Sequence, residues 1–479
     1  MTTLLYLAPI IVVIGLVGSG RVSLIKAGFG RLIATLPVVA VAMDGRADYT
    51  AFVLTESLKG AWLAWHNVAV IFAGLLLHHV IRTAAPKAGD TRQPDATMRH
   101  RQAYFLCFVT AGVVECAIGF GVGFGIAIYG LLRLGAPVHA AVALGLISQM
   151  LVPWGALSIG TVIGAALGHL PLDPFGYTSA LLMPAFGLGL LSWFWWWSHS
   201  LSFGLTVKNA VLDLLWTAAL LGLLYLGNRY VSVDTAGLVA TAPLLALGYL
   251  LDRQRLAIPR MLRIAAPFVL LVGVLLSTRL VAPLGEALRA YLVTHPFGDL
   301  PPFPWLYHAA SMLLLTAGIY GAVMLRPAQW RSAIAATWRG GRVAMATTLI
   351  FLVMARLFSA AGIPAELAAA WQSVAGDHAL LATPIFAAVA GGLTGGNTAS
   401  NSLLLPLQAA LAQSAGASVL WVGALQNVTG SMFTPFAPGK VALACAFAGW
   451  AGGERQAYRA ILPLGFILLP IALLIAALL

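Results

Sequence analysis

Residues 395–401 read Gly395-Gly-Asn-Thr-Ala-Ser-Asn401 and interrupt an apolar segment that runs from about 379 to 413. A second break, Gly119-Phe-Gly-Val-Gly-Phe-Gly125, interrupts the apolar segment 103–133. Glycine lets two chains approach closely and adopts unusual backbone angles. At membrane depth, non-helical backbone is tolerated only where protein buries it or where it lines a cavity. If these segments enter a membrane, the two stretches predict two re-entrant hairpins, 103–133 and 379–413.

The composition places the segments in a membrane. The chain has 479 residues, of which 60% are hydrophobic and only 9% are charged, whereas soluble proteins are about a quarter charged. A soluble globular fold and disorder are therefore excluded. The apolar runs are long and do not alternate, so the spans are helical, and about a dozen fit the length. Three cysteines without a CxxC motif indicate neither a disulfide framework nor a zinc site.

The excess of basic residues follows the predicted topology. With both hairpins re-entrant, roughly 20 of the 27 Lys and Arg residues fall on one face, which the positive-inside rule makes cytoplasmic. This predicts cytoplasmic loops at 82–102 and 326–342, and outer loops at 44–60 and 361–378. The net charge of +12 then mostly reflects the orientation of the chain in the membrane, and nucleic acid is not an expected partner.

Each hairpin precedes an apolar segment with a polar break, which indicates an internal repeat. The breaks are Ser148-Gln-Met-Leu-Val-Pro-Trp-Gly155 in 138–168 and Gln426-Asn-Val-Thr-Gly-Ser-Met-Phe-Thr-Pro435 in 418–449. Aligning Gln149 with Gln426 also places Gly119 on Gly396. The charge topology gives the two hairpins opposite directions, as in transporters whose sites lie where broken helices meet. The expected organisation is N-terminal spans 1–49, repeat 1 at 50–199, connecting spans 200–326 and repeat 2 at 327–479.

The breaks are the expected binding site. Uncharged hydroxyl and amide groups bind a small ion without adding charge, and helix N-termini at hairpin tips attract anions. Simple helix packing by the glycines is the alternative. The predicted site residues at the two tips and breaks are Gly121, Gly123, Gln149, Gly396, Asn397, Thr398, Ser400, Asn401, Gln426 and Asn427.

Three ionisable residues within apolar segments are further candidates, since such groups cost about 3 kcal/mol or more at membrane depth. Glu115 is the candidate carrier of a coupling proton, or else a structural partner that fixes the hairpin. Arg356 is a candidate for pairing with a substrate carboxylate, against snorkelling or a pair with Glu115. Lys440 is a candidate anion-attracting charge or a stand-in for a bound cation.

These motifs resemble those of the lactate permease family of bacterial transporters. Glu115-Cys-Ala-Ile-Gly-Phe-Gly121 resembles the family's Glu-Gly-Ala-Ala-Gly-Phe-Gly motif, and Gly395-Gly-Asn-Thr-Ala-Ser-Asn401 resembles its Gly-Ser-Asn-Thr-x-Ser-Asn motif. Pro153-Trp-Gly-Ala156, Met354-Ala-Arg-Leu-Phe-Ser-Ala-Ala-Gly362 and Gln426-Asn427 also match in order. The resemblance implies proton-coupled uptake of lactate or glycolate by an elevator-type carrier of the bacterial inner membrane.

The sequence departs from the family pattern at the expected site. Val122-Gly123 stands where the family has Thr-Pro, Gly396 replaces a Ser, and Pro438-Gly439-Lys440 replaces an uncharged polar stretch. The identity of the carboxylate, and the choice of proton or sodium as the coupling ion, therefore stay open.

The expected fold is an all-α polytopic membrane protein with about 12 transmembrane helices and two re-entrant hairpins in an inverted repeat. The expected function is a secondary transporter for small monocarboxylates that works by alternating access, without a cofactor or metal. A carrier for another organic anion, a cation/proton antiporter, a channel and an intramembrane enzyme are the alternatives; no acid pair or metal-ligand spacing supports an enzyme. Lipid is an expected partner, and a homodimer is compatible with the sequence.

Overall fold

The computed structural model describes residues 5–9, 11–12, 15, 24–43, 48–84, 96–119, 121–251 and 258–479. Most of the expected first span, and residues 85–95 and 252–257 with part of the predicted cytoplasmic charge, lie outside the described residues. The first part of the chain forms α2 Leu24–Met43, α3 Tyr49–Ala84, α4 Ala96–Tyr104, the π-helix η1 Phe105–Thr110, α5 Ala111–Ala117, α6 Val122–Arg133, α7 Val138–Ile147, the 3-10 helix η2 Ser148–Trp154, α8 Gly155–Leu167 and α9 Leu172–Ser200.

The remaining helices and two short strands follow. They are α10 Val207–Tyr230, α11 Val233–Leu250, α12 Ile258–Leu280, α13 Ala282–Ala290, β1 Val293–Thr294, β2 Phe303–Pro304, α14 Ala309–Met324, α15 Pro327–Ala360, α16 Ile363–Ala375, η3 Gly376–Leu381, α17 Ala382–Thr394, α18 Asn397–Ser414, α19 Val419–Met432, η4 Thr434–Phe436, α20 Pro438–Phe447 and α21 Glu454–Leu478. The strands pair antiparallel, with Val293 opposite Pro304.

The helices make this a multi-pass membrane protein. Within the described ranges, eight helices are long and apolar enough to cross a membrane, and the bent pair Ala265–Leu280 with Ala282–Ala290 raises the number to nine. Shorter apolar helices, among them α6, α14 and α20, account for further apolar segments. The prediction of an all-α polytopic protein is confirmed, whereas the count of about 12 spans stays a prediction.

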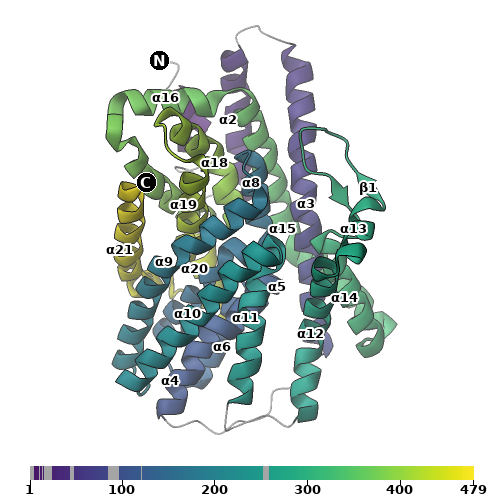
Figure 1. Ribbon diagram of the computed structural model, residues 1–479, viewed down its shortest axis with the longest axis vertical. Helices are drawn as coiled ribbons and strands as arrows, with labels where there is room; N and C mark the ends of the chain where they lie inside the picture. Colours follow the sequence, from purple (N-terminus) through teal and green to yellow (C-terminus); the bar gives the residue numbers. More distant parts are fainter. Residues whose placement is uncertain are drawn as a thin grey trace.

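The two longest helices, α3 and α15, pack against each other in opposite directions (Figure 1). A Cβ on Gly60 would lie 2.5 Å from Cα of Val353, and a Cβ on Gly341 would lie 2.9 Å from the side chain of Leu75. Because glycine removes that atom, the two backbones approach closely. The C-terminal end of α3 and the N-terminal end of α15 therefore lie at the same end of the molecule, as the charge pattern predicts.

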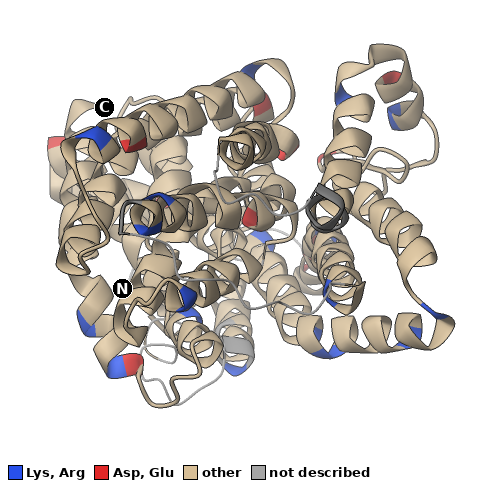
Figure 2. Ribbon diagram, turned by 90° about the horizontal axis from the view of Figure 1, so that it is seen from below, with Lys and Arg blue, Asp and Glu red and all other residues tan. Residues whose placement is uncertain are grey.

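The hairpins and broken helices lie beside this pair. Helix α8 packs against α3, and α18 packs against α15, α8 and α19. Figure 2, seen from the lower end of Figure 1, shows how few charged residues the helices carry. Helices α12 to α14 contact one another and pack against α3 through α14. The hairpins and breaks that carry the predicted site residues are therefore surrounded by helices with few charged side chains.

Helix boundaries recur along the chain at the offset of 277 residues. Adding 277 to 49–84, the bounds of α3, gives 326–361, and α15 spans Pro327–Ala360. The same shift carries α6 onto 399–410, within α18, and α9 onto 449–477, close to α21. The two halves therefore have the same order of long helix, helical hairpin, broken helix and long helix.

Candidate functional site

The first hairpin surrounds a buried carboxyl group. Gly121, the residue before α6, has a left-handed backbone with φ 79°. A Cβ on Gly123 would lie 2.4 Å from the carbonyl oxygen of Ala111, so a side chain at 123 would force α5 and α6 apart. Backbone groups of Gly121 and Gly123 hydrogen-bond the side chain of Glu115, which is only 4% exposed. The glycine-rich tip thus holds a carboxylate against the start of a helix.

The break at the start of α8 faces the same carboxyl group. Ala156, Leu157 and Ser158 all have positive φ, from 47° to 59°, and such a conformation costs about 1–2 kcal/mol for each non-glycine residue. The Ser158 hydroxyl offsets part of this cost by donating to the carbonyl oxygen of Val233 in α11, at 2.5 Å. A Cβ on Gly155 would lie 3.4 Å from Oε1 of Glu115. The kink therefore brings the N-terminus of α8 to Glu115.

The second hairpin presents its polar side chains to the first half of the chain. The amide groups of Asn397 and Asn401 each donate to Oδ1 of Asn427, both at 2.9 Å. Asn401 also donates to the carbonyl oxygen of Gly160 in α8 at 3.1 Å. Asn427 donates in turn to Ser179 in α9, at 3.0 Å. One buried asparagine of α19 thus joins α18 and α9.

A lysine from the second half meets a glutamine from the first. Nζ of Lys440 donates to Oε1 of Gln149 at 2.6 Å and to the hydroxyl of Thr434 at 3.0 Å. Gln149 is buried, whereas Lys440 is only partly buried. A Cβ on Gly395, at the tip of the second hairpin, would lie 3.7 Å from Cγ of Lys440. The ammonium group therefore sits between the second hairpin tip and the break in the first half.

Four helix N-termini meet around these side chains. Helices α6, α8, α18 and α20 begin at the two tips and the two breaks, and the residue preceding each makes no side-chain capping bond. The first turn of a helix exposes N–H groups and carries a partial positive charge. Together with Lys440 the four ends make the region electropositive, which suits a small anion.

Several buried polar atoms in the region have no hydrogen-bond partner among the described residues. They are Oε2 of Glu115, Nε2 of Gln149, and Oδ1 of both Asn397 and Asn401. A buried polar group without a partner costs about 1–3 kcal/mol. Their concentration at the hairpin tips indicates a place where a ligand or proton completes the hydrogen bonding.

Ser400 and Gln426 belong to a neighbouring polar cluster. Gln426 donates to the Ser400 hydroxyl at 3.2 Å and accepts from Gln408 at 3.4 Å. Thr383 donates to Gln408 at 2.8 Å. Gly391 and Gly430 approach closely beside this cluster, since a Cβ on Gly391 would lie 1.9 Å from the carbonyl oxygen of Gly430. These bonds hold α17, α18 and α19 together behind the tip.

Arg356 lies in a different network. Its guanidinium donates to Glu56 of α3 at 2.5 Å and to Asp299 at 2.7 Å. Lys59 binds the same two carboxylates, each at 3.1 Å. Although partial burial opposes it, the Lys59 hydrogen bond and the Arg356 charge lower the pKa of Asp299. The four charges join α3, α15 and the loop after β1. Arg356 therefore pairs with Glu56 and Asp299, and not with Glu115, the partner that the sequence analysis had considered.

The structure thus brings together most of the predicted residues from both halves. Glu115, Gln149 and Lys440 form one cluster, and Asn397, Asn401 and Asn427 form the next. Thr398 and Gly396 lie on the partly exposed second tip. Three residues of the candidate site were not predicted: Thr434, Ser179, and Thr161 of α8, which accepts a hydrogen bond from Asn427 at 3.2 Å. Thr434 stands in the polar run 426–435, whereas lone hydroxyl residues in apolar segments, such as Thr161 and Ser179, carry no signal that separates them from ordinary helix positions.

Comparison with known proteins agrees with this architecture. The family model described as L-lactate permease matches residues 294–479. The crystal structure of the YdaH transporter from Alcanivorax borkumensis, which has an unusual topology, is similar over 95% of this chain and 98% of its own. Its TM-score is 0.50 at 15% sequence identity, so this likeness concerns the fold. No curated protein matches the chain.

The matched region contains the second hairpin, the break of α19 and α20, and the Arg356 motif. The first hairpin, with Glu115, and the break before α8 precede it in the sequence. Over residues 294–479 the chain is similar to the L-lactate permease family, the family that its sequence motifs resemble.

Proposed function

We propose that the protein is a secondary active transporter for small monocarboxylates of the lactate or glycolate class, coupled to proton symport. The observation that carries the proposal is the cluster of Lys440, Gln149 and Glu115 among four uncapped helix N-termini. The family match over residues 294–479 supports the substrate class. Helix ends and an ammonium group favour an anion, and the partly exposed tip admits a small one.

In this proposal the substrate carboxylate takes the place of Gln149 as the partner of Lys440. A charge-assisted hydrogen bond to an ammonium group is stronger than one to an amide oxygen. The substrate hydroxyl group then donates to the unpaired amide oxygen of Asn397 or Asn401. The first change gives Lys440 a charged partner in place of an amide, and the second supplies a partner that the asparagine oxygen lacks without substrate.

Charge counting explains how the proton and the substrate would be coupled. Empty, the cluster holds one ammonium and one carboxylate, so it is neutral. The substrate alone leaves a net negative charge, and protonation of Glu115 alone leaves a net positive one. Substrate and proton together restore neutrality. Because moving net charge through a low-dielectric region is unfavourable, only the empty and the fully occupied states exchange sides readily.

Alternating access would move the hairpins and broken helices against α3 and α15. The antiparallel run of these two equivalent helices supports an inverted repeat, and their close backbone contact at Gly60 and Gly341 supports a rigid frame. A cross-link between α3 and α8 is then expected to stop uptake, and one between α3 and α15 to leave it intact. Labelling of cysteines in 361–378, but not in 326–342, from the outside would test the proposed orientation.

Reconstitution in liposomes tests the function. A pH gradient, acid outside, should drive accumulation of labelled lactate or glycolate, and counterflow should occur without a gradient. The charge count further predicts uptake that does not change when valinomycin and potassium set the membrane potential. Accumulation driven by a sodium gradient would show that sodium, and not the proton, is the coupling ion. Transport of other organic anions without transport of lactate or glycolate would show that the proposed substrate class is wrong.

A further inference from the structure

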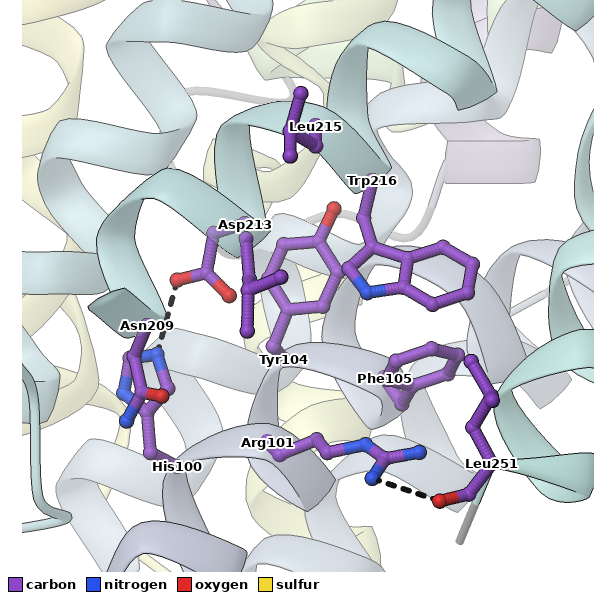
Figure 3. Close-up of a pocket in the computed structure, with 10 residues that line it drawn as sticks. His100, Arg101, Tyr104, Phe105, Asn209, Asp213, Leu215, Trp216 and Leu251 are labelled. Carbon is purple, nitrogen blue, oxygen red and sulfur yellow. Dashed lines mark hydrogen bonds and ion pairs between the residues drawn. The ribbon is translucent and has the colours of Figure 1, made fainter.

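A pocket lies between α4, η1, α10 and the end of α11 (Figure 3). Its volume is about 360 Å³. The proposed transport site does not include any of its lining residues. Two charged side chains of opposite sign, Asp213 and Arg101, face it together with aromatic and leucine side chains.

Asp213 forms the buried polar wall of this pocket. Its Oδ2 atom pairs with Nε2 of His100 at 2.9 Å and accepts from Nε1 of Trp195, also at 2.9 Å. The other ring nitrogen of His100 is bonded to the hydroxyl of Ser198 at 2.6 Å. His100 and Asp213 are 1% and 4% exposed. Both protein partners thus use one carboxylate oxygen, and the second oxygen, Oδ1, points toward the pocket (Figure 3).

Arg101 provides the opposite charge. Its guanidinium donates to the carbonyl oxygens of Gly248 and Leu251 at 2.9 and 3.2 Å, which caps the end of α11 and fixes the group in place. A guanidinium has five N–H donors, so these two bonds leave donors for a further acceptor. A planar guanidinium with free donors is well suited to a phosphate group.

Apart from Asn209, the rest of the pocket lining is apolar, and it includes leucines that are exposed on the outside of the helices. Tyr104, Phe105 and Trp216 form aromatic walls, and Phe105 and Trp216 meet edge to face at 5.0 Å. Leu215 and Leu251, which also line the pocket, are 61% and 55% exposed. The pocket lies beside the junction of α4 and η1, along the first turns of α10 and at the end of α11. The ends of membrane-spanning helices such as α10 and α11 lie near the depth of the lipid head groups.

We propose that this pocket binds the head group of a phospholipid that carries a primary ammonium, that is, phosphatidylethanolamine. The ammonium group donates to Oδ1 of Asp213, and the phosphate accepts from Arg101. The acyl chains lie along the exposed leucines of α10. The pair of opposite charges distinguishes this lipid from others: an anionic glycerol head group offers no cation to Asp213, and a quaternary ammonium has no N–H to donate.

Native mass spectrometry of the detergent-purified protein tests the site. Phosphatidylethanolamine, phosphatidylcholine and phosphatidylglycerol with identical acyl chains are added at equal concentration. We expect phosphatidylethanolamine to bind at least about tenfold more tightly than either of the others, and to raise the melting temperature most. Equal binding of phosphatidylcholine, preferential binding of phosphatidylglycerol, or no retained lipid would each overturn the assignment.

Two variants localise the binding. Asp213→Asn should remove the preference for phosphatidylethanolamine, but it also alters the bond with His100. Leu215→Trp fills the pocket from the lipid side and leaves every bond of Asp213 and Arg101 in place; it should lower binding by a similar factor. Leu226→Trp, at a lipid-facing position of α10 that is 46% exposed and outside the pocket, is the matched control. Unchanged binding by Leu215→Trp would show that the lipid binds elsewhere.

Discussion

Lys440 donates a hydrogen bond of 2.6 Å to Gln149, a residue 291 positions earlier in the chain. The bond links the break before α20 to the break before α8. The amide oxygen is a weak partner for an ammonium group compared with a carboxylate. The contact therefore holds the lysine in position while leaving it available to an anion.

Replacing this lysine tests the proposed substrate contact. Lys440→Gln keeps a hydrogen-bonding side chain but removes the charge, and hydrogen bonds to charged groups contribute about 1.5–3 kcal/mol. Uptake should fall roughly 10- to 100-fold, measured as initial rates in liposomes. Lys208→Gln, at an exposed position at the start of α10, is the control and should transport normally. Normal uptake by Lys440→Gln would place the anion elsewhere.

Glu115 is the proposed proton carrier. Glu115→Gln cannot release a proton, so the substrate-bound variant has the same charge as the fully occupied native site. Exchange of labelled for unlabelled substrate should continue, while accumulation driven by a pH gradient should be lost. Glu366→Gln, exposed on α16, should behave like the native protein. If exchange and accumulation vanish together, Glu115 is structural or binds substrate directly.

Asn427 is expected to position the second hairpin rather than to bind substrate alone. Asn427→Ala removes the acceptor shared by Asn397 and Asn401, which leaves the Asn397 amide without its described partner and the Asn401 amide with the Gly160 carbonyl alone. An orphaned buried group costs about 1–3 kcal/mol, and the bonds from Asn427 to Thr161 and Ser179 are lost as well. The free energy of unfolding should therefore fall by several kcal/mol, and uptake should be lost. Gln413→Ala, at the exposed end of α18, should change neither the melting temperature nor uptake. A variant of Asn427 with native stability and no uptake would instead mark it as a direct ligand.

Adjacent glycines of α17 offer a matched test of helix packing. A Cβ on Gly391 would lie 1.9 Å from the carbonyl oxygen of Gly430, whereas a Cβ on Gly392 meets nothing closer than 3.8 Å. Gly391→Ala should therefore force α17 from α19 and reduce the yield of folded protein in size-exclusion chromatography. Gly392→Ala should fold and transport normally. Equal behaviour of the two variants would contradict the observed contact.

The sequence predicts where the helices break, because polar residues interrupt the apolar runs at those positions. Gly119–Gly125, Gly395–Asn401 and the run from Gln426 to Pro435 stand out because unpaired polar backbone is rare in a lipid-facing helix. The boundaries of the helices around them follow from the same contrast. The offset of 277 follows from the spacing of these breaks, although the residues themselves differ.

Contacts between distant segments were not predictable in the same way. One example is the bond between Lys440 and Gln149, and another is the set of hydrogen bonds around Asn427. Both depend on how the two halves pack, which the hydropathy pattern does not encode. Arg356 shows the consequence. Its charge in an apolar run is equally consistent with a substrate ligand and with a structural ion pair, because its partners Glu56 and Asp299 lie far away in the sequence.

Arg356→Gln distinguishes these two roles. The substitution leaves Glu56, whose side chain is only 10% exposed, with Lys59 as its remaining cation in the network. Breaking a partly buried charge network should lower the melting temperature, with a loss of about 1–3 kcal/mol in the free energy of unfolding. Because the guanidinium is already engaged by two carboxylates, the KM for lactate should stay within about twofold of the native value. Arg339→Gln, at an exposed position where the side chain donates to the carbonyl oxygen of Ala335 in its own helix, should change neither quantity. A tenfold rise in KM at unchanged stability would identify Arg356 as a substrate ligand and would require the Arg356 network to open during transport.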